Sequence, residues 1–533
     1  MRREEVLRNH WFFSQEMGKE EALAPDFQRE NWQAIQVPHD WSIYNDFDQY
    51  SPAQNEGGQL NGGQAWYRTH FYLEEDASLV SVRLLFDGIY MNAQVYINGQ
   101  VLGYYPNGYT PFSYDITPYL RNDGMTNQLA VFVENQQPSS RWYSGSGIYR
   151  EVKLLITDLV HLDLYGIRIG SPKLKEQRDG WVETQLESKV SNDEPQSVSV
   201  YLEQSIWYDG QQLSDWQVTD SVVIEAEDKH HFQQAISIFQ PLLWDIDHPY
   251  LYQLKTRLYK NGILVDEEEE TFGYRYMDWQ ADKGFFLNGC WLKIHGVCLH
   301  HDYGALGAVD NRSAAERRLR QMKEMGVNAI RITHNPASSI LLDLAAKMGL
   351  LIQEEAFDTW YGGKKEYDYG RFFEEEATHP EAKAGDFWSD YDLRTMIERG
   401  KNNPAIFMWS LGNEVSEANG DAHSLKTIKR LLEKVKEVDD SRFVTMGMDQ
   451  FRFGDGSGGH EKIADLLDVV GLNYSEDNID AIRKRHPKWR LYGSETSSAT
   501  RTRDCYFRPD KEWVGDNRRV RNFEQSAYGT DRV

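Results

Sequence analysis

The chain has 533 residues, of which 40% are hydrophobic and 26% are charged, and its formal net charge is −25 at pH 7. That length exceeds what one hydrophobic core supports and predicts about three domains. The strong negative charge repels phosphate backbones, so nucleic acid is not an expected partner. No run of 18 apolar residues occurs, so no membrane partner is expected either.

The N-terminus and the cysteines indicate the cellular compartment. Residues 1–5 are basic and then acidic, and they lack the apolar core of a signal peptide. Cys290, Cys298 and Cys505 are odd in number and lack metal-ligand spacing, which fits a reducing compartment. We therefore expect a cytoplasmic protein. Cys298 lies in an apolar stretch and is predicted to be a small core residue rather than a nucleophile.

Residues 1–157 are predicted to form a jelly-roll-like sandwich. Apolar residues follow a strand pattern in 82–86 and 129–133, and Asn98-Gly99 is a strong hairpin signal. No helical period competes in this part of the sequence. These features predict an all-β domain.

Residues 158–276 are predicted to form a second, immunoglobulin-like β-sandwich. Val198, Val200 and Leu202 alternate with other residues, as on a half-buried strand. Short strands recur over about 110 residues without paired cysteines, which is typical of this fold. The acidic run 266–270 is expected to be a solvated strand edge that discourages further sheet pairing.

Near residue 277 the pattern changes to strands that alternate with helices. Ser313 and Glu316 have the spacing of a capping box at the start of one helix. Serial alternation of this length favours a (β/α)8-type barrel over an open sheet. The predicted strands are 292–299, 327–332, 350–353, 406–411, 443–448, 469–473 and 491–493.

The barrel, residues 277–533, is expected to be incomplete. No apolar strand follows Glu495, so the last strand of a closed barrel is missing from the pattern. Either the barrel is open or the sequence is a fragment of a longer protein, and we favour the fragment.

Polar side chains stand at the C-terminal ends of six predicted strands, where parallel barrels carry their catalytic groups. Asn413-Glu414 taken alone could equally cap the following helix. The convergence of acids, amides and imidazoles at one end of the barrel favours catalysis. These residues are His300, Arg331, His334, Glu354, Glu355, Asp358, Asn413, Glu414, Asn473, Tyr474 and Glu495.

Two of these residues, Glu414 and Glu495, suit glycoside hydrolysis, in which one carboxyl protonates the leaving oxygen and the other attacks the anomeric carbon. A separation of about 5–5.5 Å between them would give retention of configuration. Arg331 is a candidate for keeping Glu495 ionised. A metal hydrolase is the alternative, but the histidines of 300–302 are adjacent rather than spaced for a metal. We therefore expect neither a metal nor another cofactor.

The sequence resembles glycoside hydrolase family 2 over nearly its whole length. Residues 38–41, 66–68 and 141–150 resemble that family's sugar-binding sandwich. Residues 296–302 and 331–336 resemble its first two barrel strands. Residues 409–414 (WSLGNE) resemble the acid/base signature, and residues 493–496 resemble the nucleophile strand.

The resemblance implies a role for each matching residue. Glu414 would be the general acid/base and Glu495 the nucleophile. Asn413 would bind the sugar 2-hydroxyl, and Tyr474 would orient Glu495. The remaining implied substrate contacts are His300, His334 and Asp358, with the loop 141–144 at the rim of the pocket.

A magnesium site beside Glu414, as some relatives have, is not expected. Asp358 matches a magnesium carboxylate of those relatives, but Trp360 stands where their histidine would be. Asp358 would then touch the sugar or support its loop.

The resemblance favours the β-galactosidase branch, because residues 300–302 and 304–307 look more like that branch. The predicted function is retaining hydrolysis of terminal β-D-galactosides by double displacement, with a β-galactoside as the partner. The alternatives are a β-glucuronidase or β-mannosidase of the same family, or a carbohydrate-binding fragment without turnover. Assembly into a homo-oligomer is left open.

Overall fold

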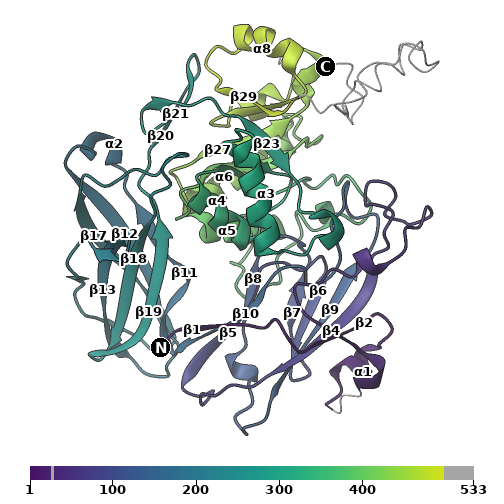
Figure 1. Ribbon diagram of the computed structural model, residues 1–533, viewed down its shortest axis with the longest axis vertical. Coiled ribbons are helices and arrows are strands. Elements are labelled where there is room, and N and C mark those ends of the chain that lie inside the picture. Colours follow the sequence, from purple (N-terminus) through teal and green to yellow (C-terminus); the bar gives the residue numbers. More distant parts are fainter. Residues whose placement is uncertain (26–28, 456, 497–533) are drawn as a thin grey trace.

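The computed structural model describes residues 1–25, 29–455 and 457–496, and these form three domains (Figure 1). The expectations for Cys505 and for the sequence after Glu495 fall on residues 497–533, outside the described residues. In the described part, no helix is both long enough and apolar enough to cross a membrane. The fold class expected from the sequence is confirmed.

The first domain packs one antiparallel sheet, with strand order β1-β10-β5-β8, against a second of order β3-β2-β4-β9-β6-β7. Alternation along the strands directs apolar residues such as Val82, Leu84 and Phe86 into the core between the sheets. The strands are β1 (Arg3–Val6), β2 (Trp11–Ser14), β3 (Gln33–Ile35), β4 (Gly63–Phe71), β5 (Val80–Phe86), β6 (Ala93–Ile97), β7 (Gln100–Tyr105), β8 (Phe112–Asp115), β9 (Asn127–Asn135) and β10 (Val152–Asp158), with a short helix α1 (Lys19–Leu23).

The second domain is also a sandwich of antiparallel sheets. One sheet has the order β11-β12-β17, and the other is built on β14-β13-β18-β19 with β15 and β16 paired to β13. Its strands are β11 (Val160–Gly170), β12 (Trp181–Asn192), β13 (Val198–Tyr208), β14 (Gln211–Gln212), β15 (Gln217–Val218), β16 (Val222–Ile224), β17 (Asp228–Phe239), β18 (Tyr252–Lys260) and β19 (Ile263–Phe272), and helix α2 is Leu174–Gln177.

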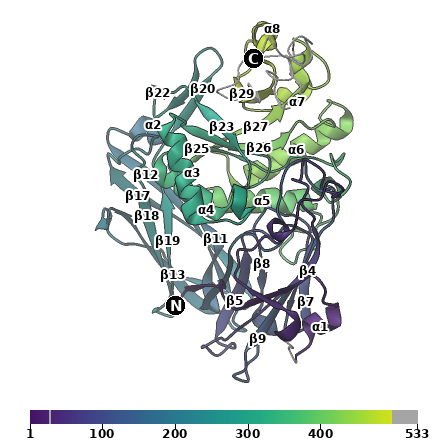
Figure 2. The same ribbon diagram turned by 45° about the vertical axis from the view of Figure 1, so that its right-hand side comes forward.

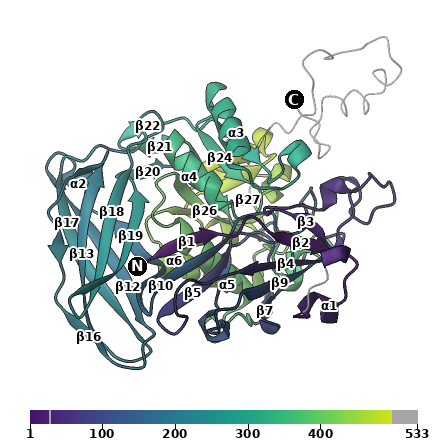
Figure 3. The same ribbon diagram turned by 60° about the horizontal axis from the view of Figure 1, so that its bottom comes forward.

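The acidic run 266–270 lies in β19, and the prediction that it is solvated was wrong for Asp266. Asp266 is fully buried and accepts hydrogen bonds from the Arg2 guanidinium and from the Leu162 amide. Glu270 accepts a hydrogen bond from Asn402 of the barrel. The period of two directs these carboxylates into the domain junction, where the N-terminus also lies (Figure 3).

The third domain begins with a small antiparallel sheet of β20 (Met277–Gln280), β21 (Gly284–Leu287) and β22 (Cys290–Trp291). Within the described residues, seven parallel strands then follow in chain order as neighbours. They are β23 (Gly296–Leu299), β24 (Ala329–Ile332), β25 (Leu351–Glu355), β26 (Ile406–Asn413), β27 (Phe443–Met448), β28 (Val470–Asn473) and β29 (Leu491–Glu495). The described residues thus form seven successive parallel strands of a (β/α)8-type barrel.

The barrel helices are α3 (Arg312–Glu324), α4 (Ser339–Met348), α5 (Trp388–Gly400), α6 (Ala422–Val438), α7 (Glu461–Ala464) and α8 (Ile479–Arg485). Helices α3 and α4 pack side by side in front of strands β23 and β25 (Figure 2). The predicted capping box at Ser313 was wrong, because Asn311 is the N-cap of α3 and accepts from the Ala314 amide. Asp421 caps α6, so Glu414 is not the helix cap that its position also allowed.

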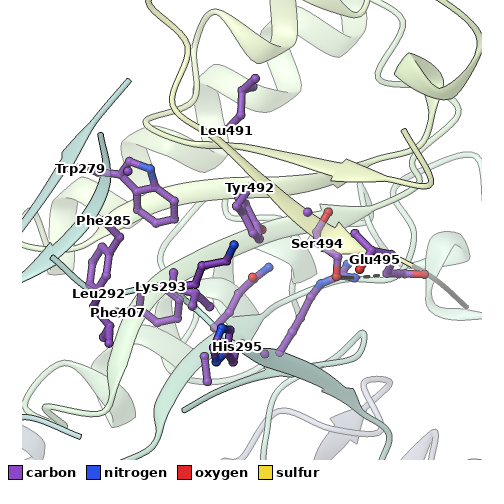
Figure 4. Close-up of a pocket in the computed structure, with 18 of the residues that line it drawn as sticks. Trp279, Phe285, Leu292, Lys293, His295, Phe407, Leu491, Tyr492, Ser494 and Glu495 are labelled. Carbon is purple, nitrogen blue, oxygen red and sulfur yellow. Dashed lines mark hydrogen bonds and ion pairs between the residues drawn. The ribbon is translucent and has the colours of Figure 1, made fainter. Parts of the chain in front are cut away.

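Strands β23 and β29 are the outer strands of the described barrel sheet, and a cavity of about 850 Å³ opens beside them. Trp279, Phe285 and Phe407 cluster at one end of this cavity, while Ser494 and Glu495 lie at the other (Figure 4). Cys298 faces the cavity and is exposed, so its predicted place in the core was wrong. The cavity opens here because no described strand covers the side of β23 away from β24.

Candidate active site

Glu414 stands directly after β26, a strand in which every residue is buried. Its amide donates to the Gly447 carbonyl of β27 at 2.8 Å. Glu414 has a left-handed backbone conformation with φ of +45°, and Tyr474 after β28 has φ of +54°. Such conformations cost on the order of 1–3 kcal/mol outside glycine and are found at functional sites. In both places the chain bends where an asparagine ends a barrel strand.

Glu495 lies at the end of β29 and is held by three side chains from other strands. The Arg331 Nη1 donates to its Oε1 at 2.7 Å, and the Tyr474 hydroxyl donates to its Oε2. The His334 Nε2 lies 3.6 Å from the Glu495 Oε1. The structure thus brings Arg331, His334 and Tyr474 together around Glu495, as their positions at strand ends led us to expect.

Arg331 is itself held by Glu355, which was predicted only as a polar strand end and was given no role in the site. The two form a buried ion pair at 2.9 Å, with side-chain exposures of 5% and 0%. Glu355 also accepts hydrogen bonds from the Ser410 Oγ and the His334 Nδ1, both at 2.6 Å. Strand alternation places Glu354 and Glu355 on opposite faces of β25, and the contact of Glu354 with Arg399 leaves Glu355 on the face toward the barrel interior.

The two catalytic candidates have opposite pKa shifts. Burial raises the pKa of Glu414, and the neighbouring Glu495 and Asp449 carboxylates raise it further. Burial also acts to raise the pKa of Glu495, but Arg331, His334 and the Tyr474 hydroxyl outweigh it and hold the pKa below its usual range. A carboxyl that holds its proton and a carboxylate that stays ionised are the pair that acid catalysis and nucleophilic attack require.

The Asn413 side-chain amide links the residues around Glu495 to those around Glu414. Its Oδ1 accepts from the Arg331 Nη2 at 2.9 Å and from the Asn473 Nδ2 at 3.1 Å. The Asn473 Nδ2 also lies 3.2 Å from the Glu414 Oε1. Glycine at position 447 leaves room for the Arg331 guanidinium beside Asn413, since a Cβ there would lie 2.6 Å from the Arg331 Nη2. Asn473 was predicted only as a polar strand end without a role, and Gly447 was not predicted at all.

His300 and His334 form one wall of the site with Trp142 from the first sandwich. The Trp142 ring centroid lies 4.8 Å from that of His300 and 4.9 Å from that of His334. Burial lowers the pKa of both histidines. Within the described residues, the buried His300 Nδ1 has no hydrogen-bond partner.

Asp358 does not present a metal site. Its Oδ1 accepts from the Arg141 Nη2 at 3.0 Å, the Lys364 Nζ at 2.8 Å and the Asn413 Nδ2 at 3.2 Å. Trp360 is fully buried and donates to the Leu411 carbonyl at 2.9 Å. These residues do not fit a divalent cation, because two cationic side chains already occupy the carboxylate and an indole stands in place of a ligand.

A jelly-roll-like sandwich, an immunoglobulin-like sandwich and a β/α barrel with paired carboxylates at its strand ends define a barrel glycoside hydrolase. The family model "Glycosyl hydrolases family 2, sugar binding domain" matches residues 6–158, and "Glycosyl hydrolases family 2" matches residues 167–275. The model "Glycosyl hydrolases family 2, TIM barrel domain" matches residues 280–492. The chain belongs to glycoside hydrolase family 2.

Among curated relatives, Beta-galactosidase BoGH2A from Bacteroides ovatus is 37% identical over 95% of this chain. A putative beta-glucuronidase from Formosa agariphila is 31% identical over 92% of this chain. The chain spans 61% and 43% of the length of these two proteins. Among solved structures, a family 2 member from Bacteroides cellulosilyticus superposes with a TM-score of 0.86 at 33% identity, over 93% of this chain and 62% of that one.

Proposed function

We propose that this protein hydrolyses terminal β-D-galactosides with retention of configuration. In the first step the Glu495 carboxylate attacks the anomeric carbon, while Glu414 gives its proton to the leaving oxygen. In the second step Glu414 takes a proton from water, which attacks the same carbon and releases Glu495. The proposal is supported first by geometry, since Arg331 and Tyr474 bind the Glu495 carboxylate while Glu414 lies beside Asn473 at the same end of the barrel. The opposite directions of the two pKa shifts agree with this arrangement.

The surrounding residues have roles that follow from their contacts. Arg331 and Tyr474 keep Glu495 ionised and fix its orientation. Asn413 is placed to bind the sugar 2-hydroxyl, a contact that strengthens in the transition state. His300 and His334 are proposed to bind further hydroxyls, and Asp358 supports Asn413.

Galactose is proposed as the sugar on two grounds. Residues 300–302 and 304–307 look like those of the β-galactosidase branch, and a β-galactosidase is among the relatives with high identity. Glucuronidases are prominent among the other relatives, so a glucuronide is the second candidate.

The test is a panel of chromogenic 4-nitrophenyl β-D-galactoside, β-D-glucuronide and β-D-mannoside with this chain. We expect the highest kcat/KM with the galactoside, and a bell-shaped pH profile whose limbs report Glu495 ionisation and Glu414 deprotonation. The acidic limb should lie below the ordinary glutamate pKa and the alkaline limb above it, as the shifts require. A higher kcat/KM with the glucuronide or the mannoside would instead identify the protein as a β-glucuronidase or a β-mannosidase.

A carbohydrate-binding protein without turnover is the alternative of another class. It is favoured by one observation, the open cavity beside β29, the strand that carries Glu495. Misplacement of a catalytic group by about 1 Å can cost on the order of a hundredfold in rate. Galactoside binding by calorimetry, with no hydrolysis of any panel substrate, would establish this alternative.

A further inference from the structure

Arg141 belongs to the first sandwich, yet its guanidinium lies in the barrel site. The Nη2 donates to the Asp358 Oδ1 at 3.0 Å, and the Nη1 lies 3.6 Å from the Glu414 Oε2. The side chain is 19% exposed, beside 13% for Asp358 and 12% for Glu414. A cation from one domain therefore stands partly desolvated between two carboxylates of another.

The loop that carries Arg141 is fixed at its far end by a buried carboxylate. The Asp40 Oδ1 accepts from the Ser146 amide at 2.9 Å, and its Oδ2 accepts from the Tyr143 hydroxyl at 2.5 Å. The same Oδ2 accepts from the Ala308 amide of the barrel at 3.0 Å. Arg141 thus comes from a segment that is bonded to both domains, which sets the position of its guanidinium.

A second contact beyond the loop joins the same two domains. Arg150 is buried and donates to the carbonyls of Pro336 at 2.9 Å and Ala337 at 3.2 Å, just after the barrel segment that carries His334. The sandwich and the mouth of the barrel are therefore held together at two places in the segment that follows Arg141.

The charges that face Glu414 are mostly negative. Glu495 of β29 and Asp449 after β27 both act to hold its proton on. Asp358 and Lys364 come from the segment after β25, and the Lys364 Nζ is bonded to Asp358 and to the Asn413 carbonyl. Arg141 is the cation near the Glu414 carboxyl itself, and it acts against the neighbouring anions.

An acid/base must lose its proton in one step and regain it in the next, so it cannot be surrounded by uncompensated anions. We propose that Arg141 is a positioning residue that the first sandwich supplies to the acid/base, placing a cation beside Glu414 and holding Asp358 against Asn413. The proposal rests on the function proposed above.

The test compares Arg141→Gln, which removes the charge, with Arg141→Lys, which keeps it. Without the cation, Glu414 should hold its proton to higher pH, so the alkaline limb of kcat/KM should move up by about one pH unit in Arg141→Gln. Arg141→Lys should keep the limb near its original place. Arg8→Gln removes a cation from an exposed pair with Glu151 in the same sandwich and is the control that should leave the profile unchanged.

A second readout needs no turnover. In protein labelled with ¹³C-carboxyl glutamate, the Glu414 signal is identified by its loss in Glu414→Gln, and its pKa is then measured in each variant. The same upward shift is expected in Arg141→Gln and not in Arg141→Lys. Equal pKa values of Glu414 in all three proteins would overturn the proposal. Failure of the proposed function would instead appear as a wild-type enzyme without hydrolysis, with the Glu414 shift still present.

Discussion

Replacing Glu495 with glutamine should lower kcat on the preferred galactoside by at least about a thousandfold. The amide cannot attack the anomeric carbon, so no covalent intermediate forms and the remaining groups offer only binding and acid assistance. The amide also replaces the carboxylate that the Arg331 Nη1 contacts at 2.7 Å. Initial rates with the chromogenic galactoside measure the effect.

The control for this variant is Glu433→Gln, which changes an exposed glutamate on the outside of α6. Its turnover should equal that of the unchanged protein. Binding of a galactose-like inhibitor by Glu495→Gln, measured by calorimetry, should persist, which separates lost chemistry from lost folding. Turnover within about threefold of wild type would rule out Glu495 as the nucleophile, because every catalytic role argued for it needs the charge.

Replacing Glu355 with alanine should destabilise the barrel by about 3–5 kcal/mol, since it removes the fully buried one of the two carboxylates that pair with the buried Arg331 guanidinium. The pair lies at 2.9 Å with almost no exposure to solvent. Glu355 also accepts hydrogen bonds from the Ser410 hydroxyl and from His334. In the alanine variant these two donors and Arg331 therefore lose the same acceptor. The midpoint of urea unfolding, followed by tryptophan fluorescence, measures the loss.

The matched control is Asp343→Ala, which also removes an acid that pairs with an arginine. In that pair the Arg312 side chain is 51% exposed and the Asp343 side chain is 35% exposed. Exposed pairs contribute about 0–1 kcal/mol, so this variant should unfold close to the wild-type midpoint. If the two variants lost equal stability, the Arg331–Glu355 pair would not hold the barrel interior together.

Much of the barrel could be predicted because its strands are short apolar runs between amphipathic helices. Strand β27 has the predicted bounds, 443–448, and β26 was predicted to within two residues. The end of the barrel at which the polar residues gather could be predicted as well, since parallel strands finish on the same side and polar residues there differ from the apolar runs before them.

The contacts between domains could not be predicted, because no local pattern encodes them. Arg141 lies 217 residues before its partner Asp358, and the sequence placed its loop near the pocket only by resemblance. The buried Asp266 looks like any residue of an acidic run until Arg2 and Leu162 are seen beside it. The burial and the partners of such side chains depend on packing between domains, which sequence periodicity does not encode.

Glu355 was missed for another reason. It was noticed as a polar strand end, but its function depends on which side of β25 faces the barrel interior. Gln353 and Glu355 share one face of that strand and Glu354 the other. Only the Arg331 and His334 contacts decide which face carries the chemistry.

The central claim is that Glu495 forms a covalent bond to the sugar while Glu414 moves the proton. The direct measurement is mass spectrometry of the protein after incubation with an activated 2-deoxy-2-fluoro-β-D-galactoside, whose fluorine slows hydrolysis of the glycosyl-enzyme. The account predicts one added sugar, on the peptide that contains Glu495, and none in Glu495→Gln. A sugar attached to another carboxylate, or hydrolysis of the natural substrate with inversion of the anomeric carbon, would contradict it.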